Sequence, residues 1–574
     1  MEESKSLSLE EALRCQVAKG MFNFYLGNYA EIINIGEIAY KEGIKQNQPL
    51  IAIDALFISF YGYYMLNRVW EARSYAELCE ELLESATHQP SSEIEKSKMH
   101  FCLIDGCIKE LYGKLDVAIE NYRNAFKISE NYDSLYYARS LCLAELGRAL
   151  MVKGEYDLAV NSHKKALEYL KGNSKLMRMQ EAANYHDIAY INLLQGDLEE
   201  SRILNEKSLD IILKSSETPM AYVGYNYTLL IGIHLEQNSI DKAKGYLQKF
   251  QHYNDNLPLP ANENMYKYSK ALILRKSTRI QDWTEAMNIL NDLINKNALI
   301  LFAIPYLCDL YLRELQITND PKILEECQPL IEKLLNITQN SNVYFNAWAR
   351  LLQGKIALLQ MNLGDARRYL TQAQDTAEKY GLQLLAQEIS VEHDKLLEQL
   401  GEWEKFKNRN TPYTERINKA SLEETMEGVL GKRGVKPPKL VSEKPLLLSI
   451  ITEGGVNLFS YAFTEDWERD NELFGSFMTA FSSFSDEYFS EGLDRAKFGK
   501  YTVLINSIKN YSICFLFTGQ SYQAKQKLAK FVEYLNDDTS IQKALDKFYE
   551  TSQVLELQQF PFLKSLISEI FIKN

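Results

Sequence analysis

A short phrase recurs along roughly the first 400 residues of this chain, and it limits the possible folds more than any other feature of the sequence. It consists of a turn-forming residue, an apolar residue two positions later and a small residue three positions after that. The clearer copies end at Ile32, Ala72, Ala118, Ala159, Ser201, Ala243 and Ala286, and two weaker ones end at Glu326 and Ala366. The steps between these nine positions range from 40 to 46 residues. A period of this kind predicts stacked units that bury their apolar faces against their neighbours.

The chemistry of the phrase predicts a pair of antiparallel helices in each unit. A glycine such as Gly154 ends a helix because it adopts positive φ without strain. The small residue that follows, here Ala159, lets the second helix approach the first closely. His163 and Ala166 continue one face of that second helix at helical spacing. Gly147, in the helix before the turn, is predicted to lie where the two helices cross.

These phrases resemble the tetratricopeptide repeat (TPR) family, in a form lengthened from the usual period of about 34 residues. The resemblance implies a mainly α fold, a TPR α-solenoid of about nine helix pairs over residues 1–404. A capping box at Ser8 and Glu11 would open it, and a helix within 382–407 would close it. First helices of such repeats line a concave groove that binds a peptide or protein partner. The candidate groove residues are Glu145, Arg148, Asn184, Tyr185, His186, Asp187, Asn192, Asn226 and Tyr227. The alternative for each is packing between repeats or a solvated helix face.

Residues 405–444 interrupt the periodic pattern. They contain ten Lys or Arg against five Asp or Glu, in a chain whose net charge is −13. The sequence GKRGVKPPKL at 431–440 is rich in turn formers and proline. This composition predicts a basic linker, with a short helix at 421–430.

Residues 445–574 have the pattern of a small α/β domain. Strands are expected at 446–452, 456–463, 501–508 and 512–518, with a further strand that ends near Phe498. Helices are expected at 471–484, at 521–535 with Ser521 as N-cap, at 540–550 and at 562–572. The predicted order is β-β-α-β-β-β-α-α.

This order resembles the longin-like domains of archaea and of eukaryotic trafficking proteins, with a roadblock-like domain as the close alternative. The resemblance is carried by four short sequence segments: ITEGG at 451–455, LFG at 473–475, GLDRAKFGKY at 492–501 and GQS at 519–521. The resemblance implies a five-stranded sheet that binds a small GTPase or pairs with a second copy to form a homodimer. Its expected partner face is Asp494, Arg495, Lys497 and Phe498. The alternative is that Asp494 and Arg495 brace a loop as a surface ion pair.

Several classes of function are disfavoured. An acidic chain lacks the basic face that nucleic-acid binding requires. The seven histidines and eight cysteines show no metal-ligand spacing, and no catalytic or nucleotide-binding signature is present, so we expect no metal, cofactor or enzymatic activity. No apolar run is long enough to span a membrane and residues 1–11 do not form a secretory signal, so a cytoplasmic location is expected.

The sequence therefore predicts a non-catalytic interaction scaffold with one partner in the TPR groove and a second on the longin-like domain. The alternative is a regulatory sensor that binds a peptide or small-molecule signal in the groove. A structural spacer is the third hypothesis, and clustered polar and aromatic groove residues argue against it.

Overall fold

The computed structural model describes most of residues 8–398 and part of the chain beyond. In the first stretch the exceptions are residues 27, 67, 172–177, 216–220 and 340. Further along it describes residues 412–413, 416, 443–452, 456–464, 467, 495–498, 500–508, 511–519, 521–537, 543, 545, 547 and 561–572. The predicted helices at 421–430 and 471–484 lie outside the described residues, as does most of the linker.

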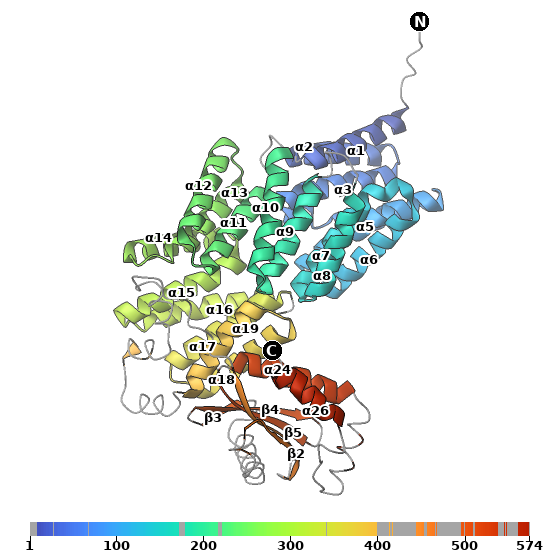
Figure 1. Cartoon of the computed structure of the whole chain (residues 1–574). Helices are drawn as coiled ribbons and strands as arrows, with labels where there is room; N and C mark the ends of the chain where they lie inside the picture. Colours follow the sequence, from blue (N-terminus) through green and yellow to red (C-terminus); the bar gives the residue numbers. More distant parts are fainter. Residues whose placement is uncertain are drawn as a thin grey trace. The chain divides into compact units, whose positions relative to one another are not determined.

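Consecutive helices form a TPR-like solenoid (Figure 1). They are α1 (Leu9–Leu26), α2 (Tyr29–Lys45), α3 (Pro49–Met65), η1 (Val69–Ala72), α4 (Tyr75–Ser85), α5 (Ser91–Leu111), α6 (Leu115–Asn131), η2 (Asp133–Leu135), α7 (Tyr136–Lys153), α8 (Tyr156–Leu170), α9 (Arg178–Leu194), α10 (Leu198–Ser215), α11 (Ala221–Glu236), α12 (Ile240–Asn256), α13 (Pro260–Leu274), α14 (Ile280–Asn295), α15 (Ile300–Thr318), α16 (Lys322–Thr338), α17 (Val343–Leu359), α18 (Leu363–Lys379) and α19 (Gln383–Glu398).

The repeating phrase marks the start of the second helix in most units. Its apolar residue is the first residue of α2, α6, α8, α10, α12 and α18. The turn residue has positive φ at Gly113, Gly154, Gly196, Asn238 and Met361. The small residues that end the phrase are fully buried at Ala118, Ala159, Ser201, Ala243, Ala286 and Ala366. The predicted helix pairs are therefore confirmed for these units.

Three copies depart from the expected pattern. In the second unit the phrase forms the short 3₁₀ helix η1, and α4 follows it. In the seventh, Trp283 lies inside α14, which begins at Ile280. In the eighth, Glu326 is exposed and Cys327 is fully buried, so the alignment of that copy is wrong by one residue.

Gly147 lies at the predicted crossing of α7 and α8. A Cβ atom at this position would come within 2.5 Å of Nε2 of His163. Only a residue without a side chain fits this crossing.

The chain divides into two compact units. The first comprises Met1–Glu314, Lys322–Ala349 and Thr376–Leu384, and the second comprises Leu315–Pro321, Arg350–Asp375 and Leu385–Asn574. The second unit thus holds parts of the last solenoid helices together with the C-terminal residues. The two units are described separately below.

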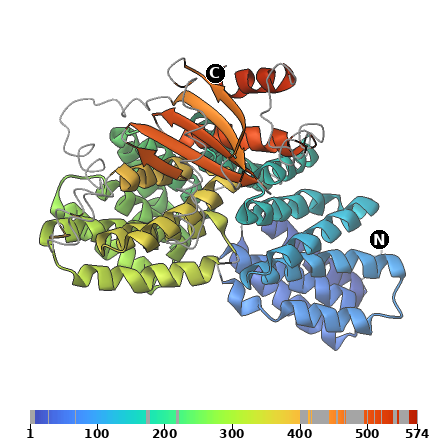
Figure 2. The same cartoon turned by 90° about the horizontal axis from the view of Figure 1, so that it is seen from below.

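The second unit contains one five-stranded antiparallel sheet (Figure 2). Its strands are β1 (Lys444–Thr452), β2 (Asn457–Ala462), β3 (Arg495–Phe498), β4 (Tyr501–Ile508) and β5 (Tyr511–Thr518), in the order β2-β1-β5-β4-β3. In register, Ser449 lies opposite Ser460 of β2 and Cys514 of β5. All five strands therefore lie where the sequence predicts them.

One face of the sheet packs against helices at the C-terminal end of the chain. These are α24 (Ser521–Asp537), α26 (Pro561–Ile567) and the π-helical turn η5 (Ser568–Ile572). Phe515 of β5 contacts Phe571 with ring centroids 4.7 Å apart, and Phe531 of α24 joins them. These rings form the centre of the domain core. The expected helices at 521–535 and 562–572 are confirmed.

Candidate functional site

Arg148 is the centre of an ion-pair network on the first helices α7 and α9. Its guanidinium lies 2.5 Å from Oε1 of Glu145, one turn earlier on α7. It also lies 3.1 Å from Oδ2 of Asp187 on α9. The Glu145 side chain is 1% exposed and Arg148 is 18% exposed. Arg148 therefore joins two neighbouring repeats and presents one edge to the surface.

Histidines complete the network on its inner side. Nδ1 of His163 lies 2.9 Å from Oδ1 of Asn184, and Nδ1 of His186 lies 3.0 Å from Oδ1 of Asn205. Burial lowers the pKa of both histidines, although Asp187 opposes that shift. The first hydrogen bond joins α8 to α9 of the next repeat, and the second joins α9 to α10 within one repeat.

The remaining candidates divide between the interior and the surface. Asn226 is fully buried, and Tyr227 is buried and stacks on Phe250 with ring centroids 5.2 Å apart. Tyr185 is half-buried, and its hydroxyl accepts a hydrogen bond from Nζ of Lys207 at 2.7 Å. The half-buried Asn192 contributes a backbone carbonyl to the turn before α10. Of the nine candidates, three are thus accessible, namely Arg148, Tyr185 and Asn192, and the others pack between helices.

Sequence reasoning missed an aromatic cluster on the later first helices α13, α15 and α17. The ring centroids of Tyr306 and Trp348 are 5.0 Å apart, and the planes are nearly perpendicular. Phe302 and Phe345 form a similar pair at 5.0 Å, and Tyr268 lies 6.2 Å from Tyr306. The signal was available, since tyrosine or tryptophan recurs after 38 and then 42 residues at positions 268, 306 and 348.

Two arginines adjoin this aromatic cluster. The Arg275 guanidinium lies 4.2 Å from the centre of the Tyr306 ring, a cation–π contact. Arg275 and Arg313 share the carboxylate of Asp309, at 3.0 and 3.2 Å. Arg313 also donates a hydrogen bond to the backbone oxygen of Arg275. Arg275, whose side chain is 12% exposed, therefore combines a cation with an aromatic ring, whereas Arg313 is buried.

Along the sequence, Gly232 of α11 lies between the ion-pair network around Arg148 and the aromatic cluster around Tyr306. It follows Tyr190 of α9 by 42 residues and Arg148 by twice that interval, so the three occupy equivalent places on successive first helices. A Cβ atom on Gly232 would meet nothing within 4 Å. Burial raises the pKa of Tyr190, with a smaller contribution from the Tyr306 phenol nearby. We use the name first-helix face for Arg148, Tyr190, Gly232, Arg275 and Tyr306.

The expected partner face of the C-terminal domain is corrected at Arg495. This side chain is fully buried, and its Nη1 lies 2.8 Å from Oδ1 of Asp394 on α19. It is neither an exposed partner contact nor half of a surface pair. Lys497 is half-buried, whereas Asp494 and the side chain of Phe498 lie outside the described residues.

Asp394 also accepts hydrogen bonds from the first residue of α24. The Ser521 hydroxyl lies 2.7 and 2.8 Å from its two carboxylate oxygens, and the Ser521 backbone nitrogen lies 3.3 Å away. A negative charge at a helix N-terminus is favourable. Arg367 of α18 donates to the backbone oxygen of Arg495 at 3.2 Å. Within the second unit, the last solenoid helices therefore hold both β3 and α24.

Other classes of site find no support in the described part of the chain. Its histidines, cysteines and carboxylates nowhere gather in a group of three that could hold a metal ion. None of the helices described is both long enough and apolar enough to cross a bilayer.

No protein-family model matches the chain, and no curated protein matches it. Among solved structures, it is similar to a Rap protein complexed with competence and sporulation factor, at 13% identity and a TM-score of 0.37, over 71% of this chain and 99% of that one. It is similar to yeast Tom70 at 14% identity and a TM-score of 0.32, over 68% of this chain and 98% of that one. A human IFIT1 dimer with m7Gppp-AAAA gives 14% identity and a TM-score of 0.34, over 75% and 96%. Because these sequence identities and TM-scores are low, the assignment of a TPR-like solenoid depends on the helix pairs of this chain itself.

Proposed function

We propose that this chain is a non-catalytic interaction protein whose first-helix face binds an extended peptide segment of a partner. The observation that carries the proposal is the open space at Gly232 on a face that otherwise presents arginine and tyrosine. A glycine at such a place lets a second backbone approach closely.

The composition of the face supports this function. Tyrosine, tryptophan and arginine supply most of the binding energy at protein interfaces, because they combine large apolar area with hydrogen bonding. Here Tyr306 is held by Trp348 and by the Arg275 guanidinium, at 5.0 and 4.2 Å. Side chains fixed before binding lose little entropy on binding. The same face would equally serve a sensor for a peptide or small-molecule signal, which is the alternative function.

We also propose a division of the chain into three regions. These are a TPR solenoid over 1–404, a basic linker over 405–444 and a longin-like domain over 445–574. The five-stranded antiparallel sheet with helices on one face supports the last of these. Its proposed role is to bind a second partner, a small GTPase or another copy of the domain. Because Arg495 is buried, a partner would contact other parts of the domain.

The test uses the full-length chain as bait in a lysate of its native host, with Gly232→Trp and Gly232→Ala as variants. The indole would fill the open space, whereas the methyl group would leave most of it free. We expect partners retained by the wild type and by Gly232→Ala to be lost from Gly232→Trp. Partners bound equally by all three proteins would show that the first-helix face is not the binding site. Circular dichroism would establish that the variants are folded.

A further inference from the structure

A second candidate site lies on the opposite side of the repeat from the first-helix face, at the second helices α10 and α12. It is a cavity of about 770 Å³. This is within the range of about 300–1,000 Å³ that small-molecule sites occupy. Its lining residues are Ile212, Leu213, Tyr227, Gly245, Gln248, Lys249, His252, Tyr253, Asn256 and Leu257.

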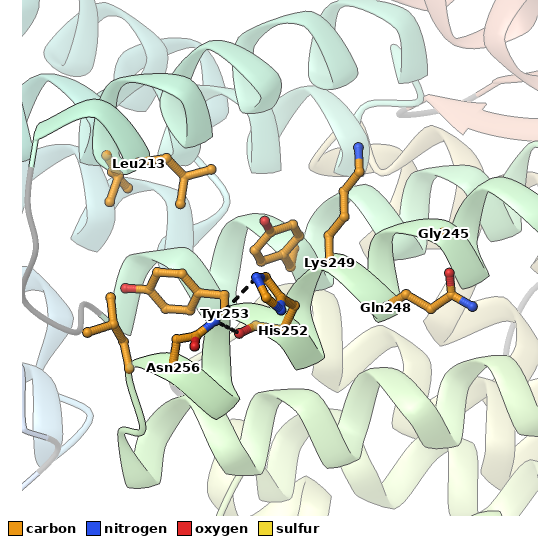
Figure 3. A pocket seen from close by; sticks show the side chains of 10 residues that line it. Leu213, Gly245, Gln248, Lys249, His252, Tyr253 and Asn256 are labelled. Atoms are coloured by element: carbon orange, nitrogen blue, oxygen red, sulfur yellow. Dashed lines mark hydrogen bonds between the residues drawn. The ribbon is translucent and has the colours of Figure 1, made fainter.

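The lining has an apolar side and a polar side. Ile212 and Leu213 come from the end of α10, and Leu213 is 45% exposed although it is a large aliphatic residue. Figure 3 shows His252 and Tyr253 in the middle, with Lys249 and Gln248 on one side and Leu213 on the other. A ligand that satisfies both sides must be amphipathic.

The polar side selects the sign of the ligand's charge. Among the lining residues that the structure describes, Lys249 is the one with a permanent charge, and none is Asp or Glu. Its Nζ lies 5.1 Å from the centre of the Tyr246 ring, beside the cavity. An anionic group on the ligand would therefore meet a cation and no opposing carboxylate.

His252 supplies a donor on the same side. Its Nε2 lies 3.3 Å from Nδ2 of Asn256, and that Nδ2 also donates to the His252 backbone oxygen at 2.8 Å. Since an amide nitrogen can only donate, Nε2 accepts this hydrogen bond, and in that tautomer the ring proton is on Nδ1. The Nδ1–H group is the donor that His252 can offer to an anion.

Gly245 leaves open space beside Gln248 and Lys249 (Figure 3). It lies on the same face of α12 as Gln248, Lys249 and His252, and a Cβ there would meet nothing within 4 Å. Tyr253 provides a ring surface in the middle of the cavity, two helical turns further along α12 (Figure 3). A flat ring can stack on such a surface.

We propose that this cavity binds a small organic anion with an aromatic body. The ring lies against Tyr253 and Leu213, and the carboxylate or phosphate meets Lys249 and His252. This site is separate from the proposed partner-binding face and does not depend on it.

The experiment uses the full chain and three probes with the same ring: indole-3-acetate, neutral indole-3-acetamide and cationic tryptamine. Binding is measured by calorimetry and by saturation-transfer NMR. For indole-3-acetate we expect a dissociation constant on the order of 0.1–1 mM, as suits a ligand of this size. We expect the acetamide to bind more weakly and tryptamine not to bind. Equal affinity for tryptamine and indole-3-acetate would overturn the proposal.

Two variants with matched controls locate the site. Lys249→Glu should weaken indole-3-acetate binding at least about tenfold, by reversing the charge. Lys244→Glu makes the same change at an exposed position of α12 that does not line the cavity, and should leave binding unaltered. Gly245→Trp should abolish binding by filling the space, whereas Gly364→Trp adds the same side chain at an open glycine of α18 and should not. Binding that survives Gly245→Trp or Lys249→Glu would contradict the proposal.

Discussion

Arg148 in the first unit and Arg495 in the second are both held by buried ion pairs, yet their surroundings differ. Arg148 has two carboxylates, from its own helix and from the equivalent helix of the next repeat, and keeps one edge at the surface. Arg495 is fully buried and, among the described residues, pairs with one carboxylate, that of Asp394, which lies 101 residues away in the sequence. Its Nε and Nη2 have no hydrogen-bond partner in the described part of the chain.

The difference teaches how each region tolerates a change. A network in which two acids share one base can lose one acid and still keep the charge of the base compensated. An arginine that depends on one acid has no such reserve, and an unpaired charge in the interior is costly. The predictions below test this contrast, beginning with the largest expected effect.

Replacing Asp394 by Ala should be the most damaging change. It removes the carboxylate with which Arg495 pairs among the described residues, and it leaves the Ser521 backbone nitrogen without its acceptor. We expect a loss of about 3–5 kcal/mol in the stability of the second unit. Chemical denaturation followed by hydrogen exchange in β1 and β5 would measure it.

The matched control is Asp375→Ala, which removes the exposed carboxylate paired with Lys525. Exposed pairs contribute little, so this change should cost less than about 0.5 kcal/mol. Similar losses for the two variants would show that burial of the Arg495 pair does not matter.

Arg148→Met should cost about 3 kcal/mol in the first unit at pH 8, because it leaves Glu145 and Asp187 buried without their cation. The loss should be smaller at pH 5, since an unpaired buried carboxylate takes up a proton and loses its charge. Denaturation midpoints at the two pH values measure this difference. Arg123→Met, at an exposed position of α6, should leave stability unchanged at both.

Gly147→Ala should destabilise the solenoid by about 1–3 kcal/mol, because the added methyl group overlaps the ring of His163 and forces the helices apart. Gly232→Ala makes the same substitution within α11, where the space is open, and should stabilise by about 0.5–1 kcal/mol through helix propensity. Thermal melts of the two variants give opposite shifts if this is right. Shifts of the same sign would mean that the crossing at Gly147 can relax.

The smallest effect concerns pH and Glu110 of α5. Burial and the nearby charge of Glu145 raise its pKa to about 7, although a hydrogen bond from Tyr122 opposes the shift. The folded protein thus keeps a proton that the unfolded chain loses near pH 4.5, the ordinary pKa of a glutamate. A shift of this size corresponds to about 3 kcal/mol for a fully buried group. Because Glu110 is only half-buried, stability should fall by about 1–2 kcal/mol as pH rises from 4.5 to 7 and level off above that. Glu110→Gln should remove this part of the pH dependence, and an unchanged profile would contradict the assignment.

The features of this molecule that could be predicted from the sequence are those that recur with the repeat. The turn at Gly154 and the buried Ala159 follow from the repeat, because both perform the same task in each unit. Glu145 and Asp187 are one repeat interval apart, so their approach to Arg148 was implicit in the spacing. The eighth copy of the phrase was misaligned by one residue. Its buried position, which is usually alanine, is taken by the small residue Cys327 instead of Glu326.

Arg495 could not have been placed from its sequence neighbours. An arginine at the start of a strand is usually exposed, and nothing in GLDRAKFGKY points to an aspartate on a helix far upstream. Similarly, the aromatic cluster around Tyr306 was missed because the candidate residues were sought only as far as Tyr227.

The separation between Asp394 and Arg495 also sets an order of events during synthesis. A ribosome adds about 5–20 residues each second, so Asp394 emerges roughly 5–20 s before the arginine that it must pair with. For that interval the end of the growing solenoid has neither β3 nor α24 to cover it. A nascent chain that stalls there would carry an uncovered helix face, which makes this stretch a natural place for a chaperone to act.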